Sequence, residues 1–263
     1  MTLGFLGTGA ITSAMVTGLN SSAGAGYSIR VSPRNAATAA GLARSFPNVS
    51  VAATNQEVLD QSETVVIAVR PQITESVLAQ LRFRPDHKVI SVVSGFSVQK
   101  VGGLVAPAAK ITRAVPLPSA ARRQSPTAVY PRDAETVELF GRLGAAFAVD
   151  SELEFAALCT VTATMATYFA FADTAATWLE GQGIAPREAR AYVARIYAGL
   201  AETASEANGR GFQTLAAEHA TRGGTNEQVL QYMSSHGAFD RYREALDGIL
   251  RRVTASAAPR DAS

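Results

Sequence analysis

The chain has 263 residues, 47% of them hydrophobic, and its formal net charge is +2. This length suits one large domain or two smaller ones, and the apolar content excludes a disordered chain. A charge so near neutrality gives no reason to expect nucleic acid or an anionic membrane surface as a partner. The single cysteine, Cys159, excludes a disulfide within the chain and fits a reducing compartment, so we expect a cytoplasmic protein.

The first residues have the order strand, glycine turn, helix. Residues 3–6 are mostly apolar, Gly7 and Gly9 follow, and apolar side chains then recur at helical spacing. This is the opening of a dinucleotide-binding fold, in which the second glycine lets a pyrophosphate approach the backbone at a helix start. The third position, usually Gly or Ala, is Thr12 here, and a tight turn without a nucleotide is the alternative. The predicted contacts with the dinucleotide here are Gly7, Thr8, Gly9, Ala10 and Ile11.

The end of the second expected strand, residues 27–32, indicates which dinucleotide binds. Folds that take NAD usually carry Asp or Glu there, about 20 residues after the glycines, to hold the ribose hydroxyls. Here Ser32, Pro33, Arg34 and Asn35 occupy that place, with an arginine and no carboxylate. Because Ser32 and Arg34 would bind a 2′-phosphate, we predict NADP (NADPH) as the cofactor. The alternative for Arg34 is a solvated loop residue.

Strands and helices alternate as far as residue 150. Further strands are expected at residues 49–51, 64–69, 89–93, 110–115, 127–130 and 145–149, with helices in most of the intervals. The predicted fold class is therefore α/β, with residues 1–150 forming a Rossmann-type doubly wound parallel sheet that binds NAD(P). Residues just beyond strand ends face the ligand crevice in such sheets. The cofactor contacts predicted beyond the glycine turn are Ser32, Arg34, Asn35, Asn55, Ala68, Val69, Arg70 and Pro71.

From residue 151 onwards the pattern is helical. We expect one long helix at 153–181, another from Pro186, and shorter ones around 214–218, 226–234 and 239–253, before a small-residue tail. The uncharged run at 155–172 approaches the length of a membrane span, but it contains four threonines and charged residues flank it. A helix buried in a core or subunit interface is the better interpretation, so we expect no membrane. Residues 151–263 are predicted to form an all-helical dimerisation and substrate domain of a homodimer or higher homo-oligomer.

Several of these segments together resemble pyrroline-5-carboxylate reductase. The resemblance extends in matching order across nearly the whole chain and is carried by residues 3–19, 31–35, 66–72, 90–98 and 223–225. It implies an amino-terminal NAD(P) domain and a carboxyl-terminal helical domain that dimerises. It also implies reduction of a cyclic imine carboxylate, 1-pyrroline-5-carboxylate, to proline by NAD(P)H, in a site between the cofactor and helices of both subunits.

Three segments depart from the family pattern. Residues 162–166 lack the usual serine, glycine and proline, and Leu117 lies in a proline-rich loop where the family has asparagine. Residues 220–226 read Ala-Thr-Arg-Gly-Gly-Thr-Asn. By position, the resemblance places the family's carboxylate-holding serine on Thr221 and its hydroxyl near the imine nitrogen on Asn226.

This loop is the candidate substrate site. Backbone N–H groups at a helix start, after two glycines, would hold a carboxylate, and Arg222 is a candidate salt partner for an acidic substrate. We expect Thr225 and Asn226 as catalytic residues and Thr221, Arg222, Gly223 and Gly224 as substrate contacts. The alternative is a helix cap beside an exposed arginine. His219 and Asp173 are further candidates for the proton donor.

Two functional hypotheses remain open. The first is an NADPH-dependent reductase of a C=N bond, acting on pyrroline-5-carboxylate or on a different imine or carbonyl substrate. The second is a non-catalytic NADP-binding sensor that has lost the substrate site. The sequence shows no Ser/His/Asp order and no metal-ligand spacing, so no metal is predicted.

Overall fold

The computed structural model describes residues 1–21 and 26–257. Within this range the chain forms two compact units, the first made of Met1–Cys159 with the described residues from Arg252 on, and the second of Thr160–Arg251. Most of the loop expected at residues 21–26 and the end of the expected tail lie outside the described residues.

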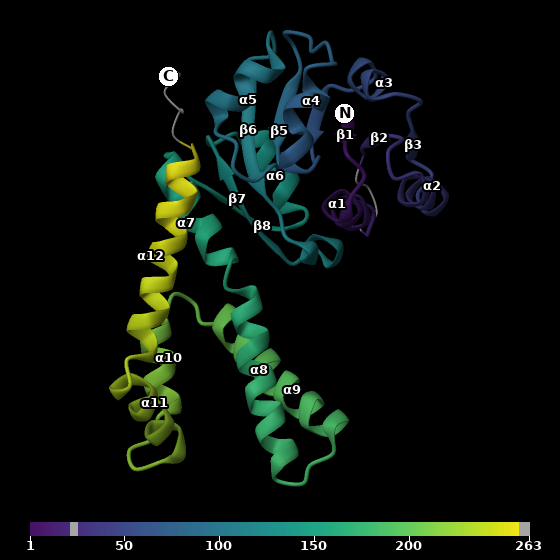
Figure 1. Ribbon diagram of the computed structural model, residues 1–263. Coiled ribbons are helices and arrows are strands. Elements are labelled where there is room, and N and C mark those ends of the chain that lie inside the picture. Colours follow the sequence, from purple (N-terminus) through teal and green to yellow (C-terminus); the bar gives the residue numbers. More distant parts are fainter. Residues whose placement is uncertain (22–25, 258–263) are drawn as a thin grey trace. The chain divides into compact units, whose positions relative to one another are not determined.

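The first unit is built on an eight-stranded sheet (Figure 1). Its spatial order is β3-β2-β1-β4-β5-β6-β7-β8, so the chain reverses its direction of winding on either side of β1. Every expected strand is present. The bounds are β1 Thr2–Leu6, β2 Ser28–Val31, β3 Val49–Val51, β4 Thr64–Ile67, β5 Lys88–Ser91, β6 Lys110–Val115, β7 Ser125–Tyr130 and β8 Gly144–Ala148.

One pair of strands departs from the expected parallel arrangement. β6 and β7 run antiparallel, with Ala114 opposite Val129, whereas the other neighbouring strands are parallel. Only a short connection, containing the 3₁₀ helix η2 (Pro118–Arg122), joins these two strands. A parallel return needs a crossover of a dozen or more residues, so this connection permits only the antiparallel pairing.

Helices cover both faces of the sheet because apolar side chains of its central strands alternate between the faces. In β4, Val66 packs into a core with α1, α2 and α6, whereas Val65 and Ile67 pack into a core with α3, α4 and α5. The sheet is therefore doubly wound. The helix bounds are α1 Ala10–Asn20, α2 Ala36–Ser45, α3 Asn55–Asp60, α4 Thr74–Leu78, α5 Val98–Val105 and α6 Ala134–Gly141, and the 3₁₀ helix η1 spans Pro71–Ile73.

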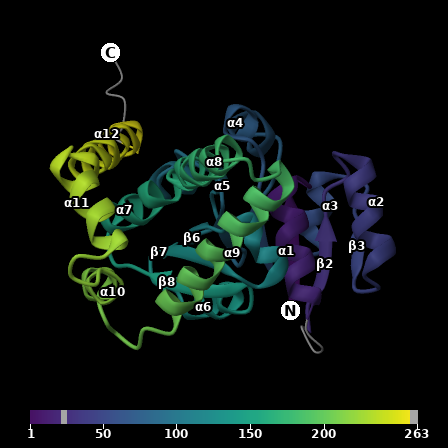
Figure 2. The same cartoon turned by 90° about the horizontal axis from the view of Figure 1, so that it is seen from below.

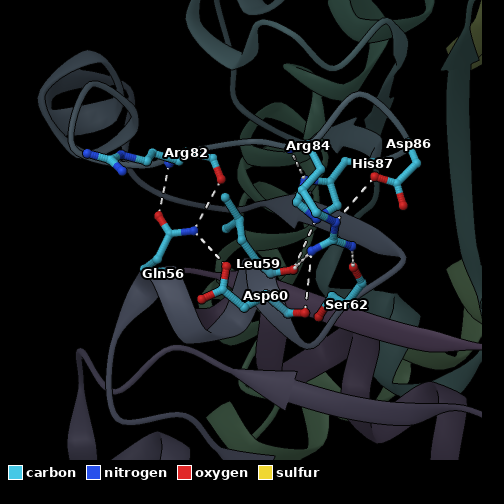
Figure 3. Close-up of polar contacts among 8 residues, drawn as sticks. All are labelled: Gln56, Leu59, Asp60, Ser62, Arg82, Arg84, Asp86 and His87. Atoms are coloured by element: carbon cyan, nitrogen blue, oxygen red, sulfur yellow. Dashed lines mark hydrogen bonds and ion pairs between the residues drawn. The ribbon is translucent and has the colours of Figure 1, made fainter.

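The loop before β5 is joined by polar contacts to the end of α3 (Figure 3). The Arg84 guanidinium donates to the carbonyl oxygens of Leu59 and Ser62, each at 3.0 Å. The buried His87 ring lies 3.0 Å from the Leu59 carbonyl through Nε2 and accepts the Arg84 backbone N–H through Nδ1 at 3.0 Å. These contacts tie the end of α3 and the residues that follow it to the loop before β5.

The helix expected at residues 153–181 is two helices, α7 (Glu152–Thr162) and α8 (Met165–Gly181). Between them, the N–H groups of Ala163 and Thr164 bond three residues back, and the Thr164 hydroxyl donates to the Val161 carbonyl at 2.8 Å. Threonine hydroxyls compete with amides for helical carbonyls, so this threonine-rich segment interrupts the helix.

In the second unit, α8 and α9 (Pro186–Ser205) form an antiparallel pair (Figures 1 and 2). Ala176 of α8 and Ala189 and Val193 of α9 are the buried residues of their small core, and the Tyr168 and Tyr197 rings lie 5.4 Å apart. The remaining helices are α10 Phe212–His219, α11 Thr225–Ser235 and α12 Ala238–Ala257.

The stretch Glu152–Gly181 is long and apolar enough to cross a membrane by length and composition alone. Only 17% of its most apolar window is buried within this chain. Helices in the cores and interfaces of soluble proteins pass the same test of length and composition, so the stretch does not by itself define a membrane span.

Candidate functional site

The turn after β1 is held by contacts on its buried side. Gly7 has φ +98°, and a Cβ on it would lie 2.6 Å from the Ala68 carbonyl oxygen, so only glycine fits. Its N–H donates to Ser32 Oγ at 2.9 Å. The hydroxyl of Thr12 is buried and donates to the Gly7 carbonyl at 2.7 Å. Thr12, unusual for the dinucleotide fingerprint, thus stabilises the turn directly.

The loop after β2 is bonded to the same turn. Thr8 Oγ1 donates to the Ser32 carbonyl at 2.7 Å, and Asn35 Nδ2 donates to the Thr8 carbonyl at 3.1 Å. The Ser32 side chain is fully buried beneath the turn. This differs from the expectation that its hydroxyl binds a 2′-phosphate, because that hydroxyl already satisfies Gly7 and faces Thr8. Asn35 adopts a left-handed backbone conformation, with φ 64°, and its side-chain bond to Thr8 joins the loop to the turn.

The other side of the turn is open. Gly9 and Ala10 are exposed, and a Cβ built on Gly9 meets no atom within 4 Å. No side chain caps α1. Among the described residues, no protein acceptor bonds the N–H groups of Ala10 and Ile11. Free amides at the positive end of a helix dipole form a cradle for an anion, and a pyrophosphate fits this open backbone.

The remaining predicted cofactor contacts follow β2, β3 and β4, which are parallel to β1 and adjacent in the sheet order. Arg34, Arg70 and Pro71 are exposed, whereas Asn55, Ala68 and Val69 are partly buried. Because the carboxyl ends of parallel strands share one edge, the sheet places all of them along the edge that carries the glycine turn.

The predicted substrate loop lies in the second unit, between α10 and α11. Gly223 has φ +74°, and the Gly224 N–H donates to the Thr221 carbonyl at 2.8 Å, so the backbone folds back on itself. Thr221, Arg222, Thr225 and Asn226 are all exposed.

Glu227 is the residue that the sequence reasoning missed in this loop. Its carboxylate oxygen Oε2 accepts the Gly223 N–H at 2.7 Å. An acidic residue three positions after an N-cap commonly reaches back to the residues ahead of the helix, and with Gly224 as the N-cap this spacing could have identified it.

The two candidate proton donors and the single cysteine lie in other surroundings. His219 Nδ1 lies 2.8 Å from the Leu215 carbonyl of its own helix, and Asp173 is exposed on α8. Burial raises the pKa of the Cys159 thiol to about 11, although the Arg113 guanidinium partly opposes this shift. Cys159 is therefore a neutral thiol at physiological pH and a poor nucleophile. Among the described residues, no group of three His, Cys, Asp or Glu side chains could hold a metal ion.

The fold and the turn together define a class of protein. The chain has a doubly wound sheet, an uncapped glycine turn after a central strand, and a helical unit that follows the sheet. The class is that of two-part α/β oxidoreductases that bind a dinucleotide at the carboxyl edge of the sheet. Comparison with known proteins shows which members of this class the chain is similar to.

Two family models match the chain. Residues 2–95 match the model described as NADP oxidoreductase coenzyme F420-dependent, and residues 152–255 match the model of the pyrroline-5-carboxylate reductase dimerisation domain. A pyrroline-5-carboxylate reductase from Pseudomonas aeruginosa is 24% identical over 176 residues, and this match spans 64% of each protein, less than two thirds of the relative's length.

Solved structures show the same fold. A pyrroline-5-carboxylate reductase from Coxiella burnetii matches with a TM-score of 0.85 at 20% identity, covering 98% of both chains. A Plasmodium falciparum pyrroline carboxylate reductase with NADP bound matches with a TM-score of 0.80 at 16% identity, also over 98% of both chains. The chain is therefore similar to pyrroline-5-carboxylate reductases, in its dimerisation domain by sequence and over nearly its whole length by fold.

Proposed function

We propose that this protein is an NADPH-dependent reductase of C=N bonds. The observation that carries the proposal is the open face of the glycine turn, where Gly9 leaves free space beside the uncapped start of α1. The family, whose named relatives reduce pyrroline carboxylates, supplies the class of reaction.

The choice of NADPH over NADH rests on the residues after β2. The buried Ser32 closes the turn from beneath, so the exposed Arg34 is the residue that we assign to the 2′-phosphate. A solved relative with NADP bound supports this choice. The amides of Ala10 and Ile11 would hold the pyrophosphate, and the exposed Arg70 adds positive charge along the same edge.

The reaction asks little acid or base chemistry of the protein. NADPH supplies a hydride when bound, and an iminium carbon is already electrophilic. What the chain must supply is orientation of the substrate, which we assign to the loop containing Thr221, Arg222, Gly223 and Gly224, and a polar group near the nitrogen, which we assign to Thr225 or Asn226. A homo-oligomer in the cytoplasm, with the dimerisation domain at the subunit interface, completes the proposal.

Steady-state assays test the proposal. The purified protein is mixed with NADPH and with 1-pyrroline-5-carboxylate, 1-pyrroline and a panel of other cyclic imines and keto compounds, and NADPH oxidation is followed by absorbance. We expect oxidation with at least one imine, and slower oxidation of NADH with the same substrate. The absence of NADPH oxidation with every compound would contradict the reductase assignment.

A second candidate is a protein that binds NADP without catalysis. It is favoured by the departures from the family pattern, among them Asn226 in place of the family's hydroxyl residue in the substrate loop. Calorimetric binding of NADPH combined with no turnover of any imine or keto compound would support it and reject the reductase.

A further inference from the structure

We infer that Glu227 selects against acidic substrates, so that the preferred substrate is an imine without a carboxylate group. This inference rests on the proposed reductase function and on the assignment of residues 221–226 to the substrate.

The loop has the geometry of an anion site. Gly223 is in the left-handed region with φ +74°, and a Cβ on Gly224 would lie 2.8 Å from the Thr221 carbonyl oxygen. The backbone N–H groups of this compact turn stand ahead of α11, an eleven-residue helix whose N-cap, Gly224, makes no side-chain capping bond. Successive N–H groups at a helix start attract a carboxylate.

In this chain the carboxylate of Glu227 itself lies against this turn. Glu227 Oε2 accepts the Gly223 N–H at 2.7 Å, and Glu227 is in the first turn of α11, where a helix dipole favours one negative charge. Glu227 is partly buried, so its charge is less screened than that of a fully exposed side chain.

A substrate carboxylate in the same loop would meet this negative charge. Two like charges within about 4–6 Å disfavour each other, and the amide that Glu227 occupies is withdrawn from the substrate. The neighbouring Arg222 is exposed, so water and salt weaken the attraction between its positive charge and a substrate carboxylate. Asn226 is an uncharged group with both a donor and an acceptor, which suits a neutral polar substrate.

The test compares two rings that differ only by the acid group, 1-pyrroline and 1-pyrroline-5-carboxylate. For the wild-type protein with NADPH we expect a higher kcat/KM for 1-pyrroline. In Glu227→Gln, which keeps an oxygen acceptor but removes the charge, we expect the ratio of kcat/KM for the acidic ring to that for the neutral ring to rise by about tenfold. Glu244→Gln removes the same charge from an exposed position on α12 and is the matched control, whose ratio should stay at the wild-type value.

Ionic strength separates a charge effect from a structural one. Added salt screens like-charge repulsion, so it should raise the ratio in the wild-type protein and have less effect in Glu227→Gln. If the variant does not fold, the wild-type ratio and its salt dependence still decide the question. A wild-type preference for the acidic ring, or the same ratio in Glu227→Gln and Glu244→Gln, overturns the inference and leaves the reductase assignment intact. Failure of NADPH oxidation with both rings and the wider panel overturns the reductase assignment, and the inference with it.

Discussion

Individual side chains beneath the glycine turn determine its shape. Thr12 and Ser32 are fully buried, and their hydroxyls bond the carbonyl and the N–H of Gly7 respectively. A buried amide or carbonyl without a partner costs about 1–3 kcal/mol, so these two hydroxyls stabilise a conformation that the backbone alone would not hold. The ligand-facing side of the turn carries almost no side chain, and it is there that substitutions should affect binding without affecting the fold.

Gly9→Ala tests this division. Because the new methyl group meets no atom within 4 Å, the free energy of unfolding should change by no more than about 0.5 kcal/mol. The methyl group would occupy the space we assign to the pyrophosphate, so the Kd for NADPH should rise at least about tenfold in a fluorescence titration. Gly41→Ala, on α2 and also with open space around it, is the control: it should leave the Kd for NADPH unchanged and raise the free energy of unfolding by about 0.5–1 kcal/mol, because alanine favours a helix interior. Tight NADPH binding by Gly9→Ala would place the cofactor elsewhere.

Arg34→Gln tests the assignment of the 2′-phosphate. A charge-assisted contact with a phosphate contributes to NADPH binding but not to NADH binding, since NADH lacks that group. We expect the Kd for NADPH to rise about tenfold and the Kd for NADH to change little, as measured by calorimetry. Arg44→Gln, an exposed arginine in the last turn of α2, should change neither value. Equal loss of both cofactors in Arg34→Gln would contradict the assignment.

At the scale of the elements, the end of α3 depends on the loop that precedes β5. Leu59 and Ser62 carbonyls accept hydrogen bonds from Arg84, and the His87 ring contacts the Leu59 carbonyl as well (Figure 3). Since Nδ1 of His87 accepts the Arg84 N–H, the ring must be neutral with its proton on Nε2. Burial lowers the pKa of His87 most, and the Arg84 guanidinium lowers it further. The bond to the Leu59 carbonyl and the Asp86 and Asp60 carboxylates partly oppose these effects.

This pKa shift predicts a loss of stability in mild acid. The folded pKa lies below the ordinary value of 6.5, so the unfolded chain binds more protons as the pH falls below that value. The contribution of His87 to the free energy of unfolding should therefore be greatest above pH 6.5. It should decrease as the pH falls from 6.5 towards the lower pKa of the folded state. Urea unfolding at a series of pH values measures this decline.

His87→Asn is the matching variant. Its amide oxygen can accept the Arg84 N–H, but the contact with the Leu59 carbonyl is lost, so unfolding at pH 7.5 should cost about 1–2 kcal/mol less. The decline in mild acid should flatten in His87→Asn and persist in His236→Asn, an exposed histidine that follows α11. A wild-type stability that is level across this pH range would show that His87 does not control it.

At the scale of the whole molecule, the helical unit has large apolar side chains that the described residues leave mostly exposed. Trp178, Phe169 and Tyr192 are 63%, 67% and 64% exposed on α8 and α9. Large exposed apolar side chains are typical of an interaction face, and the match to a dimerisation domain indicates a second copy of the chain as the partner.

Light scattering at micromolar concentration should therefore give at least twice the mass of one chain. Trp178→Glu places a charge in the expected interface and should shift the protein towards monomers. Phe147→Glu changes an equally large side chain, 51% exposed on β8, and should leave the assembly intact. A monomeric wild-type protein would contradict the homo-oligomer.

Local pattern was sufficient to predict the eight strands, the alternation of helices with them, and the change to helices alone in the second half. These features depend on apolar periodicity and on glycine positions, which are properties of neighbouring residues. The contact of the Glu227 carboxylate with the Gly223 N–H is local, and its spacing from the N-cap could have identified it. Tertiary structure decided the antiparallel pairing of β6 with β7 and the burial of Ser32 beneath Gly7. Which donor meets which acceptor depends on how the backbone folds back on itself, and composition and spacing do not specify that.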